Sequence, residues 1–220
     1  AETCRGASRR FQRRGEEKGV QGFDDYAHHP TEVAARLHAA RRRFPDSRIR
    51  VLFQPHLFSR TRFFASDFAR ALSLADDVIV TGIFPARERQ EDYPDVTADT
   101  IVAAARGMKN PGVADQDVVV PDATALDSTA LDATALDATD QESASSDRSA
   151  RGGRPVRGGR ERDDSAAWIQ AVGDMHLAAQ MMAMRAHRGD VIFTVGAGDI
   201  TDMAPVIIHA LQAHRGTCEV

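Results

Sequence analysis

Side chains that can bind anions and transfer protons follow two apolar segments of this sequence. Asp24-Asp25-Tyr26-Ala27-His28-His29-Pro30 comes after the first, and Phe53-Gln54-Pro55-His56-Leu57-Phe58-Ser59-Arg60-Thr61 comes after the second. A carboxylate at a strand end can accept hydrogen bonds from ribose hydroxyls, and a guanidinium at the start of a helix favours a carboxylate or a phosphate. Open α/β sheets bind ligands beyond the carboxyl ends of their strands, so both segments are candidates for one site.

The acids and histidines of the first segment each have a second interpretation. Asp24 and Asp25 are equally suited to capping the helix that follows them. His28 and His29 are adjacent, so in regular structure their rings point apart and do not share a metal ion, although Pro30 favours an irregular turn. No further histidine or cysteine lies at metal-ligand spacing nearby. We therefore expect these histidines to form hydrogen bonds, and we expect no metal site.

Two later segments follow apolar runs in the same way. Arg87 and Glu88 come after the third run, where an isolated pair of this kind is usually a surface ion pair. Gly196-Ala197-Gly198-Asp199 comes after the last run, and close backbone approach to a ligand and a simple tight turn are equally good interpretations of it. The sequence has no GKT phosphate loop and lacks the full spacing of a dinucleotide fingerprint.

The segments that must position these residues alternate between strand-like and helix-like patterns. Apolar, β-branched runs predict strands at residues 20–23, 49–53, 78–84, 118–120 and 191–195. Apolar stripes between them have helical spacing, and helix starts are expected at Thr31, Thr97 and Thr201. The alternation predicts an α/β fold with a Rossmann-like, mostly parallel sheet and helices on both faces.

Residues from about 122 to 164 interrupt this pattern. A five-residue repeat begins at Ala123, and arginines recur among glycines from Arg148 to Arg162. A period of five fits neither a helix nor a strand, so the composition favours a long, disordered, low-complexity loop inserted into one domain. Arg-Gly spacing of this kind also binds RNA, which is the alternative interpretation.

The composition of the 220 residues limits the class of protein. The 42% hydrophobic content is enough for one good core or two small ones. A net charge of -4 gives no overall electrostatic reason to expect nucleic acid or an anionic membrane as partner. No apolar run approaches the roughly 20 residues of a membrane span, and Cys4 and Cys218 are expected to be free thiols. We therefore expect a cytoplasmic protein without a membrane or nucleic-acid partner.

In their order, these motifs resemble the C-terminal domain of the Mur ligases, most closely that of the members that join L-alanine to UDP-N-acetylmuramate. The matching segments are residues 24–32, 53–62, 83–88 and 195–200. The resemblance runs from about Gly6 to Leu211 and does not include the insertion. Residues 6–11 resemble the family's linker from a central ATPase domain. The expected organisation is therefore a linker at 1–19 and a Mur ligase C-terminal domain at 20–220.

The resemblance implies an ATP-dependent, amide-forming ligase that works through an acyl phosphate on the sugar nucleotide, which the amine of L-alanine attacks. Arg10 would reach the ATP phosphates, with Arg9 beside it, and Asp25 would hold the ATP ribose. The catalytic residues would be Arg10, His28 and Arg60. The substrate-binding residues would be Tyr26, His28, His56, Arg60, Arg87, Gly198 and Asp199.

The resemblance also implies what this chain needs from elsewhere. ATP and Mg²⁺ are the implied cofactors, the phosphate loop and the magnesium ligands lie in the central domain, and UDP-N-acetylmuramate binds an N-terminal domain. The 220 residues alone are therefore expected to be inactive. Gly82, Phe84 and Gln12 depart from the family pattern, which bears on amino-acid affinity. The alternatives are a related ligase that attaches a recycled murein peptide to the same sugar nucleotide, and a noncatalytic binding module.

Overall fold

The computed structural model describes residues 9–106, 108 and 168–213, all of which belong to one compact unit. The strand predicted at 118–120, the insertion at about 122–164 and both cysteines lie outside these residues. Within the described ranges, no helix has the length and apolar character that crossing a bilayer requires.

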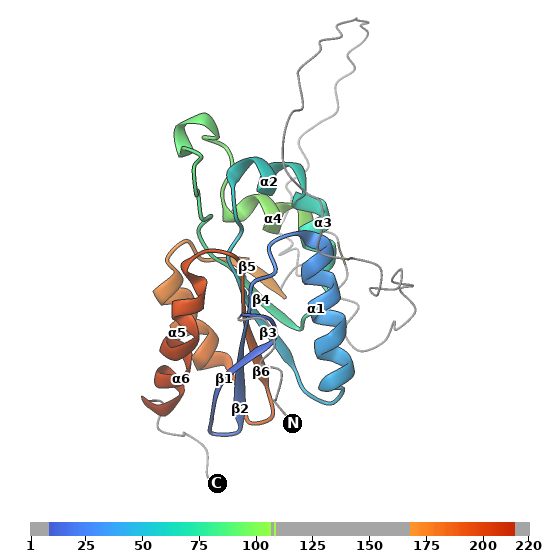
Figure 1. Cartoon of the computed structure of the whole chain (residues 1–220), viewed down its shortest axis with the longest axis vertical. Coiled ribbons are helices and arrows are strands. Elements are labelled where there is room, and N and C mark those ends of the chain that lie inside the picture. Colours follow the sequence, from blue (N-terminus) through green and yellow to red (C-terminus); the bar gives the residue numbers. More distant parts are fainter. Residues whose placement is uncertain (1–8, 107, 109–167, 214–220) are drawn as a thin grey trace, which may run out of the picture. The chain divides into compact units, whose positions relative to one another are not determined.

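The unit is built on a six-stranded sheet with the strand order β1-β2-β6-β3-β4-β5 (Figure 1). The strands are β1 (Gln12–Glu17), β2 (Val20–Asp25), β3 (Ile49–Phe53), β4 (Asp77–Val80), β5 (Ile169–Ala171) and β6 (Val191–Val195). Strand β1 runs antiparallel to β2, and all other neighbouring strands are parallel. The predicted class, a mostly parallel α/β sheet, is confirmed.

Helices cover both faces of this sheet (Figure 1). One face carries α1 (Pro30–Arg43), α3 (Ala65–Leu72) and α4 (Ala98–Ala105), and the other carries α5 (Met175–Arg185) and α6 (Met203–Ala213). Alternate residues of β3 serve the two cores: Val51 and Phe53 pack under α1, α3 and α4, whereas Leu52 packs under α5 and α6. Strands buried on both faces are apolar throughout, which is why the sequence showed them as continuous runs.

Capping side chains set the helix starts. His29 caps α1 by accepting a 3.4 Å hydrogen bond from the Thr31 N–H, while the Glu32 carboxylate accepts one of 3.2 Å from the His29 N–H. The helix start predicted at Thr31 is therefore late, because α1 begins at Pro30 and His29 is its cap. Thr97 caps α4 as predicted. Thr201 does not cap a helix, because it lies inside the 3₁₀ turn η4 (Asp199–Asp202), and α6 begins at Met203.

The predicted strands differ from the observed ones where the backbone finds partners outside the regular ladder. The predictions for β3 and β6 are confirmed to the residue. The predicted strand at 78–84 is too long, because β4 ends at Val80 and the Gly82 N–H donates to the Gly173 carbonyl at 3.2 Å. Farther on, Phe84 forms only an isolated bridge with His56. The short edge strand β5 was not predicted.

Strand β1 lies in the segment that the sequence analysis assigned to a linker. It pairs with β2 through a two-residue turn at Lys18 and Gly19, which have φ angles of 51° and 76°. Two positive φ angles are the mark of a type I′ hairpin, whose twist matches that of the strands it joins. Apart from Gly15, every residue of β1 is polar or charged, which suits an exposed sheet edge. The folded part of the chain therefore begins before residue 20.

A buried ion-pair network holds the amino ends of the parallel strands. Arg50 of β3 is 3% exposed, and its guanidinium contacts Asp77 of β4 and, at 2.7 Å, the carboxylate of Asp190 just before β6. Arg185 of α5 adds a second cation to Asp77 at 3.3 Å. Removing one member of a buried ion pair leaves the remaining charge without a partner, which costs far more than losing a surface pair.

We expect Arg50→Ala to lower the free energy of unfolding by about 3–5 kcal/mol, because Asp77 and Asp190 lose their shared cation. The exposed pair between Arg70 and Asp67 is the matched control, and Arg70→Ala should change stability by less than about 1 kcal/mol. Urea unfolding of the two variants measures both values. Equal losses in the two variants would show that the buried network is not a main source of stability.

Candidate functional site

The candidate site lies at the carboxyl ends of β2, β6 and β3, where neighbouring strands send the chain to opposite faces of the sheet. The chain leaves β2 toward α1 and leaves β3 toward α2 (Phe58–Phe63), but it leaves β6 toward η4 and α6 on the other face (Figure 1). Open α/β sheets bind their ligands at strand ends where the connections part in this way.

Four rings from three of the predicted motifs form a continuous row in the site. The ring centroids of Tyr26 and His28 are 5.2 Å apart, and those of His28 and His56 are 5.7 Å apart. His56 in turn stacks on Phe84 at 5.7 Å. The predicted substrate-binding residues Tyr26, His28 and His56 are therefore brought together by the fold, and Phe84, which the sequence analysis treated only as a departure from a pattern, supports them.

Two polar atoms of this site are buried without a hydrogen-bond partner among the described residues. They are Nδ1 of His56, in the segment that joins β3 to α2, and Nη1 of Arg60, in the first turn of α2. Buried polar atoms in folded proteins nearly always have a partner, so each such atom calls for an explanation. An anionic ligand such as a carboxylate would satisfy the guanidinium, and a hydrogen-bonding ligand atom would satisfy the imidazole.

The electrostatic surroundings of His56 favour its neutral form. Burial, followed by the nearby charges of Arg60 and His28, lowers the pKa of His56 below its ordinary value, against an opposing effect of Glu88. Positive charge at this end of the site therefore comes from guanidinium groups, with Arg60 the larger influence on His56 and Arg87 the smaller. A neutral imidazole beside it can donate or accept a hydrogen bond without adding a second full charge.

Glu88 connects the third motif to the second. Its carboxylate accepts a 3.0 Å hydrogen bond from the Ser59 N–H and another from the Ser59 hydroxyl. Burial raises the pKa of Glu88, but the two Ser59 hydrogen bonds, a backbone hydrogen bond from Phe58 and the charge of Arg87 together bring the pKa below its ordinary value. Glu88 is thus a brace for the start of α2. Arg87 remains exposed near His56, so the predicted substrate contact of Arg87 lies at the rim.

Gln54, which follows β3, fixes the loop at residues 196–199, called the glycine loop below. Its Nε2 donates to Asp199 at 2.7 Å, and its Oε1 accepts a 3.1 Å hydrogen bond from the Ile200 N–H. Gly196 has a φ of 150°, and a Cβ on Gly198 would lie 2.7 Å from the Phe84 ring. The loop therefore needs both glycines, and it packs beside the row of rings. Asp199, a predicted substrate ligand, is exposed but already bonded to Gln54.

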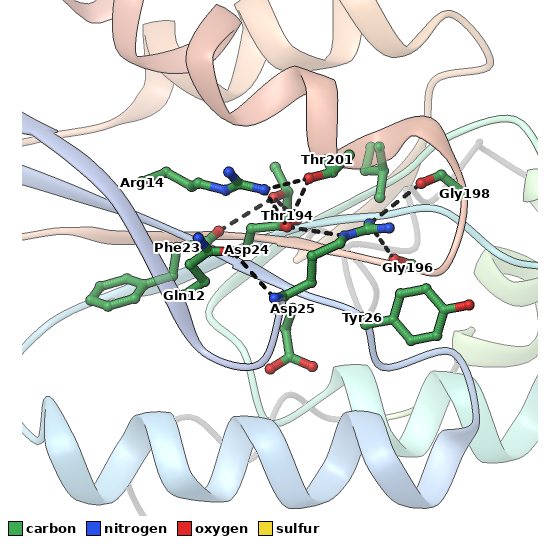
Figure 2. A network of polar contacts seen from close by, with 12 residues as sticks. Gln12, Arg14, Phe23, Asp24, Asp25, Tyr26, Thr194, Gly196, Gly198 and Thr201 are labelled. Carbon is green, nitrogen blue, oxygen red and sulfur yellow. Dashed lines mark hydrogen bonds and ion pairs between the residues drawn. The ribbon is translucent and has the colours of Figure 1, made fainter. Parts of the chain in front are cut away.

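Figure 2 shows a second polar cluster, centred on Asp24 at the end of β2. Asp24 is fully buried, and its Oδ2 accepts from Arg9 at 3.2 Å, Arg14 at 3.0 Å and Thr201 at 2.8 Å. Its Oδ1 accepts from Thr194 of β6 at 2.9 Å. Neither of the two interpretations offered for Asp24 describes this role as a hub, because its partners are up to 177 positions away in the sequence.

Asp25, the predicted ribose ligand, has partners for both of its carboxylate oxygens. Oδ2 accepts from the Phe11 N–H at 2.7 Å and pairs with Arg36 at 3.2 Å, and Oδ1 accepts from the Ala27 N–H at 3.0 Å. The side chain is 1% exposed. Burial raises its pKa above the ordinary value, against the lowering by Phe11 and Arg36. A ribose hydroxyl would have to compete with these contacts.

The two neighbouring arginines that precede β1 have different surroundings. Arg9 is bonded inward to Asp24 and to the carbonyls of Gly196 and Gly198. Arg10 is exposed, and no ion pair or hydrogen bond of its side chain occurs within the described residues. Of the two, Arg10 is the one whose guanidinium is free to meet a ligand.

Comparisons with known proteins show the family to which this chain belongs. A family model described as "Mur ligase, glutamate ligase domain" matches residues 9–140. The chain is 53% identical over 214 residues to the UDP-N-acetylmuramate--L-alanine ligase of Bifidobacterium adolescentis, covering 97% of this chain and 31% of that protein. It is equally identical over 219 residues to the enzyme of that name from Bifidobacterium longum, covering 100% of this chain and 33% of that protein. The chain thus spans about a third of the length of these relatives.

Solved structures share the fold. The UDP-N-acetylmuramate-alanine ligase of Thermotoga maritima has a TM-score of 0.55 at 21% identity, with 96% of this chain and 31% of that chain covered. A murein peptide ligase from Psychrobacter arcticus has a TM-score of 0.57 at 15% identity, with the same coverage. At these identities the likeness concerns the fold alone.

We expect Gly198→Ala to destabilise the protein by about 1–3 kcal/mol and to displace the glycine loop, because the new methyl group overlaps Gln54 and the Phe84 ring. Gly173→Ala is the control, since a Cβ there meets nothing within 4 Å, and it should stay within about 0.5 kcal/mol of the parent. Thermal unfolding of the three proteins makes the comparison. A harmless Gly198→Ala would mean that the loop is not packed against the rings.

We expect the His56 imidazole to titrate below its ordinary pKa of about 6.5 and to shift upward in Arg60→Gln. Removing a neighbouring positive charge favours the protonated ring, and the remaining burial keeps the recovery partial. NMR titration of the His56 ring protons measures the shift. Arg62→Gln is the control, because Arg62 is exposed and paired with Asp95, and it should leave the His56 pKa in place.

Proposed function

Because this chain belongs to the Mur ligase family and carries its glutamate ligase domain, we propose that it is the C-terminal part of an ATP-dependent ligase that joins L-alanine to UDP-N-acetylmuramate. The 53% identity to enzymes of that name supports this acceptor. In the structure, the observation that carries the proposal is the pair of buried, unsatisfied atoms on His56 and Arg60. An amino acid brings the carboxylate that this pair lacks.

Arg60 and His56 are proposed to hold the carboxylate of L-alanine. A charged hydrogen bond from a guanidinium to a carboxylate is stronger than a neutral one, and the buried position of Nη1 shields it from water. Tyr26 and His28 continue the row of rings from His56 and would border the amine. The amine must be unprotonated to attack an acyl phosphate, and His28 is the basic side chain of this row nearest to His56.

Arg10 is proposed to meet the phosphates of ATP. It is exposed at the entrance to the domain, and a guanidinium stabilises the charge that moves onto phosphate oxygens in the transition state. Asp25 would help to define the nucleotide side of the site, mainly by fixing Phe11 next to Arg10. The described residues contain no cluster of acids, histidines or cysteines that can hold a metal ion, so Mg²⁺ would take its ligands elsewhere.

The proposed reaction needs domains in addition to the one described here. The relatives are about three times as long, and the phosphate loop and the sugar-nucleotide site would lie in the remaining domains. These domains are the proposed partners of the domain described here. The cytoplasm is the proposed location because ATP is available there. Catalysis would then consist of positioning and charge stabilisation across the domain boundary.

We expect the full-length protein to release phosphate only when ATP, UDP-N-acetylmuramate and L-alanine are all present with Mg²⁺. Omitting each substrate in turn tests the requirement. If a tripeptide gives a higher kcat/KM than L-alanine, the protein is the murein-peptide ligase. If the intact protein shows no substrate-dependent phosphate release with either acceptor, the proposed activity is wrong and a noncatalytic module is favoured.

In the same assay, Arg60→Gln should raise the KM for L-alanine by roughly 10- to 100-fold, because a charged hydrogen bond is worth about 1.5–3 kcal/mol. Arg62→Gln removes the same charge two residues away on the exposed side of α2 and should leave that KM unchanged. Equal effects of the two substitutions would remove Arg60 from the amino-acid site.

A further inference from the structure

Arg9 points its guanidinium into the domain, directly beside the exposed Arg10. Its Nε donates to Asp24 at 3.2 Å, and its Nη2 donates to the Gly196 carbonyl at 2.9 Å and to the Gly198 carbonyl at 3.4 Å (Figure 2). The guanidinium also lies 5.1 Å from the centroid of the Tyr26 ring. One side chain thus joins the start of the domain to the glycine loop and to the row of rings.

The backbone around Arg10 is fixed on both sides. The Arg9 carbonyl accepts a 2.7 Å hydrogen bond from the Tyr26 N–H, and the Phe11 N–H donates to Asp25 at 2.7 Å. The Phe11 ring packs 5.0 Å from the Phe193 ring. Arg9 and Phe11 both have positive φ angles, 63° and 50°, which non-glycine residues adopt only when their surroundings impose it. The direction in which Arg10 leaves the domain is therefore set by its two neighbours.

We propose that Arg9 is a positioning residue: it fixes the exposed Arg10 guanidinium relative to the Gly196–Gly198 loop, so that both face the same ligand. The structural part of this inference stands on the contacts of Arg9 alone. Its consequence for catalysis rests on the proposed ligase function, in which Arg10 meets the ATP phosphates. Arg9 itself touches no reacting atom and acts through Arg10 and the loop.

The chemistry of the contacts requires arginine. A guanidinium presents several donors in a rigid plane, so it can serve one carboxylate and two carbonyls at the same time. A lysine ammonium is a single charged point, and it can keep the ion pair with Asp24 but not the full set of contacts. Since a displacement of about 1 Å in a positioned group can cost on the order of 100-fold in rate, loss of Arg9 should be felt mainly in kcat.

A double-mutant cycle in the full-length protein tests this inference. We expect Arg9→Ala to lower kcat by about 10- to 100-fold while the KM for L-alanine changes little. If Arg9 acts through Arg10, the double variant Arg9→Ala/Arg10→Ala should be no slower than Arg10→Ala alone. Fully additive losses would overturn the proposal, because they would show that Arg9 acts independently of Arg10.

Arg14→Ala is the matched control for charge and fold. Arg14 donates to the same Asp24 oxygen at 3.0 Å, but it also donates to the Thr201 hydroxyl and not to the carbonyls of the glycine loop. Arg14→Ala should therefore keep kcat within about threefold of the parent. If Arg9→Ala fails to fold, Arg9→Lys takes its place in the cycle, and it should show a partial loss of kcat with the same lack of additivity.

Hydrogen exchange separates this inference from the proposed function. In Arg9→Ala, and not in Arg14→Ala, the backbone amides of residues 196–200 should exchange faster, because the Gly196 and Gly198 carbonyls lose their shared donor. Unchanged exchange in this loop would overturn the proposal even in an active enzyme. Faster exchange in a protein without any phosphate release would support the fixing of the loop while the ligase activity itself fails.

Discussion

The structure depends on a buried carboxylate that gathers donors from distant parts of the chain. Asp24 is fully buried at the end of β2, and it is bonded to an arginine from the start of the domain, an arginine of β1, a threonine of β6 and a threonine of η4. A charge removed from water is tolerated only when hydrogen bonds and opposite charges replace its hydration. The position of each partner is thereby constrained, and the carboxyl ends of β2 and β6 are held together.

The amino ends of the strands are held by the same kind of interaction, with a buried cation in place of the buried carboxylate. There a buried cation, Arg50, joins the acids Asp77 and Asp190 at the amino ends of the strands. Between these two polar clusters, the strands bury apolar side chains on both faces of the sheet. The apolar layers supply most of the driving force for folding, whereas the two charged clusters fix which strand ends lie side by side.

The residues of the candidate site are of two kinds: some form hydrogen bonds within the domain, and others keep polar groups available for a ligand. The polar groups of Gln54, Glu88 and Arg9 form hydrogen bonds with other parts of the domain. Within the part of the chain that the structure describes, the exposed Arg10 side chain has no polar partner, and Arg60 has a buried nitrogen without one. An enzyme that works by positioning and charge stabilisation needs both kinds, because a ligand-binding group is effective only when its orientation has already been fixed.

The sequence by itself determined the fold class, the strands β3 and β6, the cap of α4 and the position of the four polar motifs after strands. These features depend on local patterns: continuous apolar runs for strands buried on both faces, helical spacing for the covering helices, and side chains that cap helix ends. The grouping of Tyr26, His28 and His56 also followed from the sequence, since successive parallel strands bring their carboxyl ends to one edge.

Only the tertiary structure decided which polar groups are used internally and which remain available. Nothing local distinguishes Arg9 from Arg10 or Asp24 from Asp25, and the segment around β1 has too little apolar character to be recognised as part of a sheet. Their roles depend on partners such as Thr194, Gly196 and Thr201, which lie more than 160 residues away along the chain. A hydrogen bond is set by the position of two atoms in space, and for such distant pairs that position exists only after the whole sheet has formed.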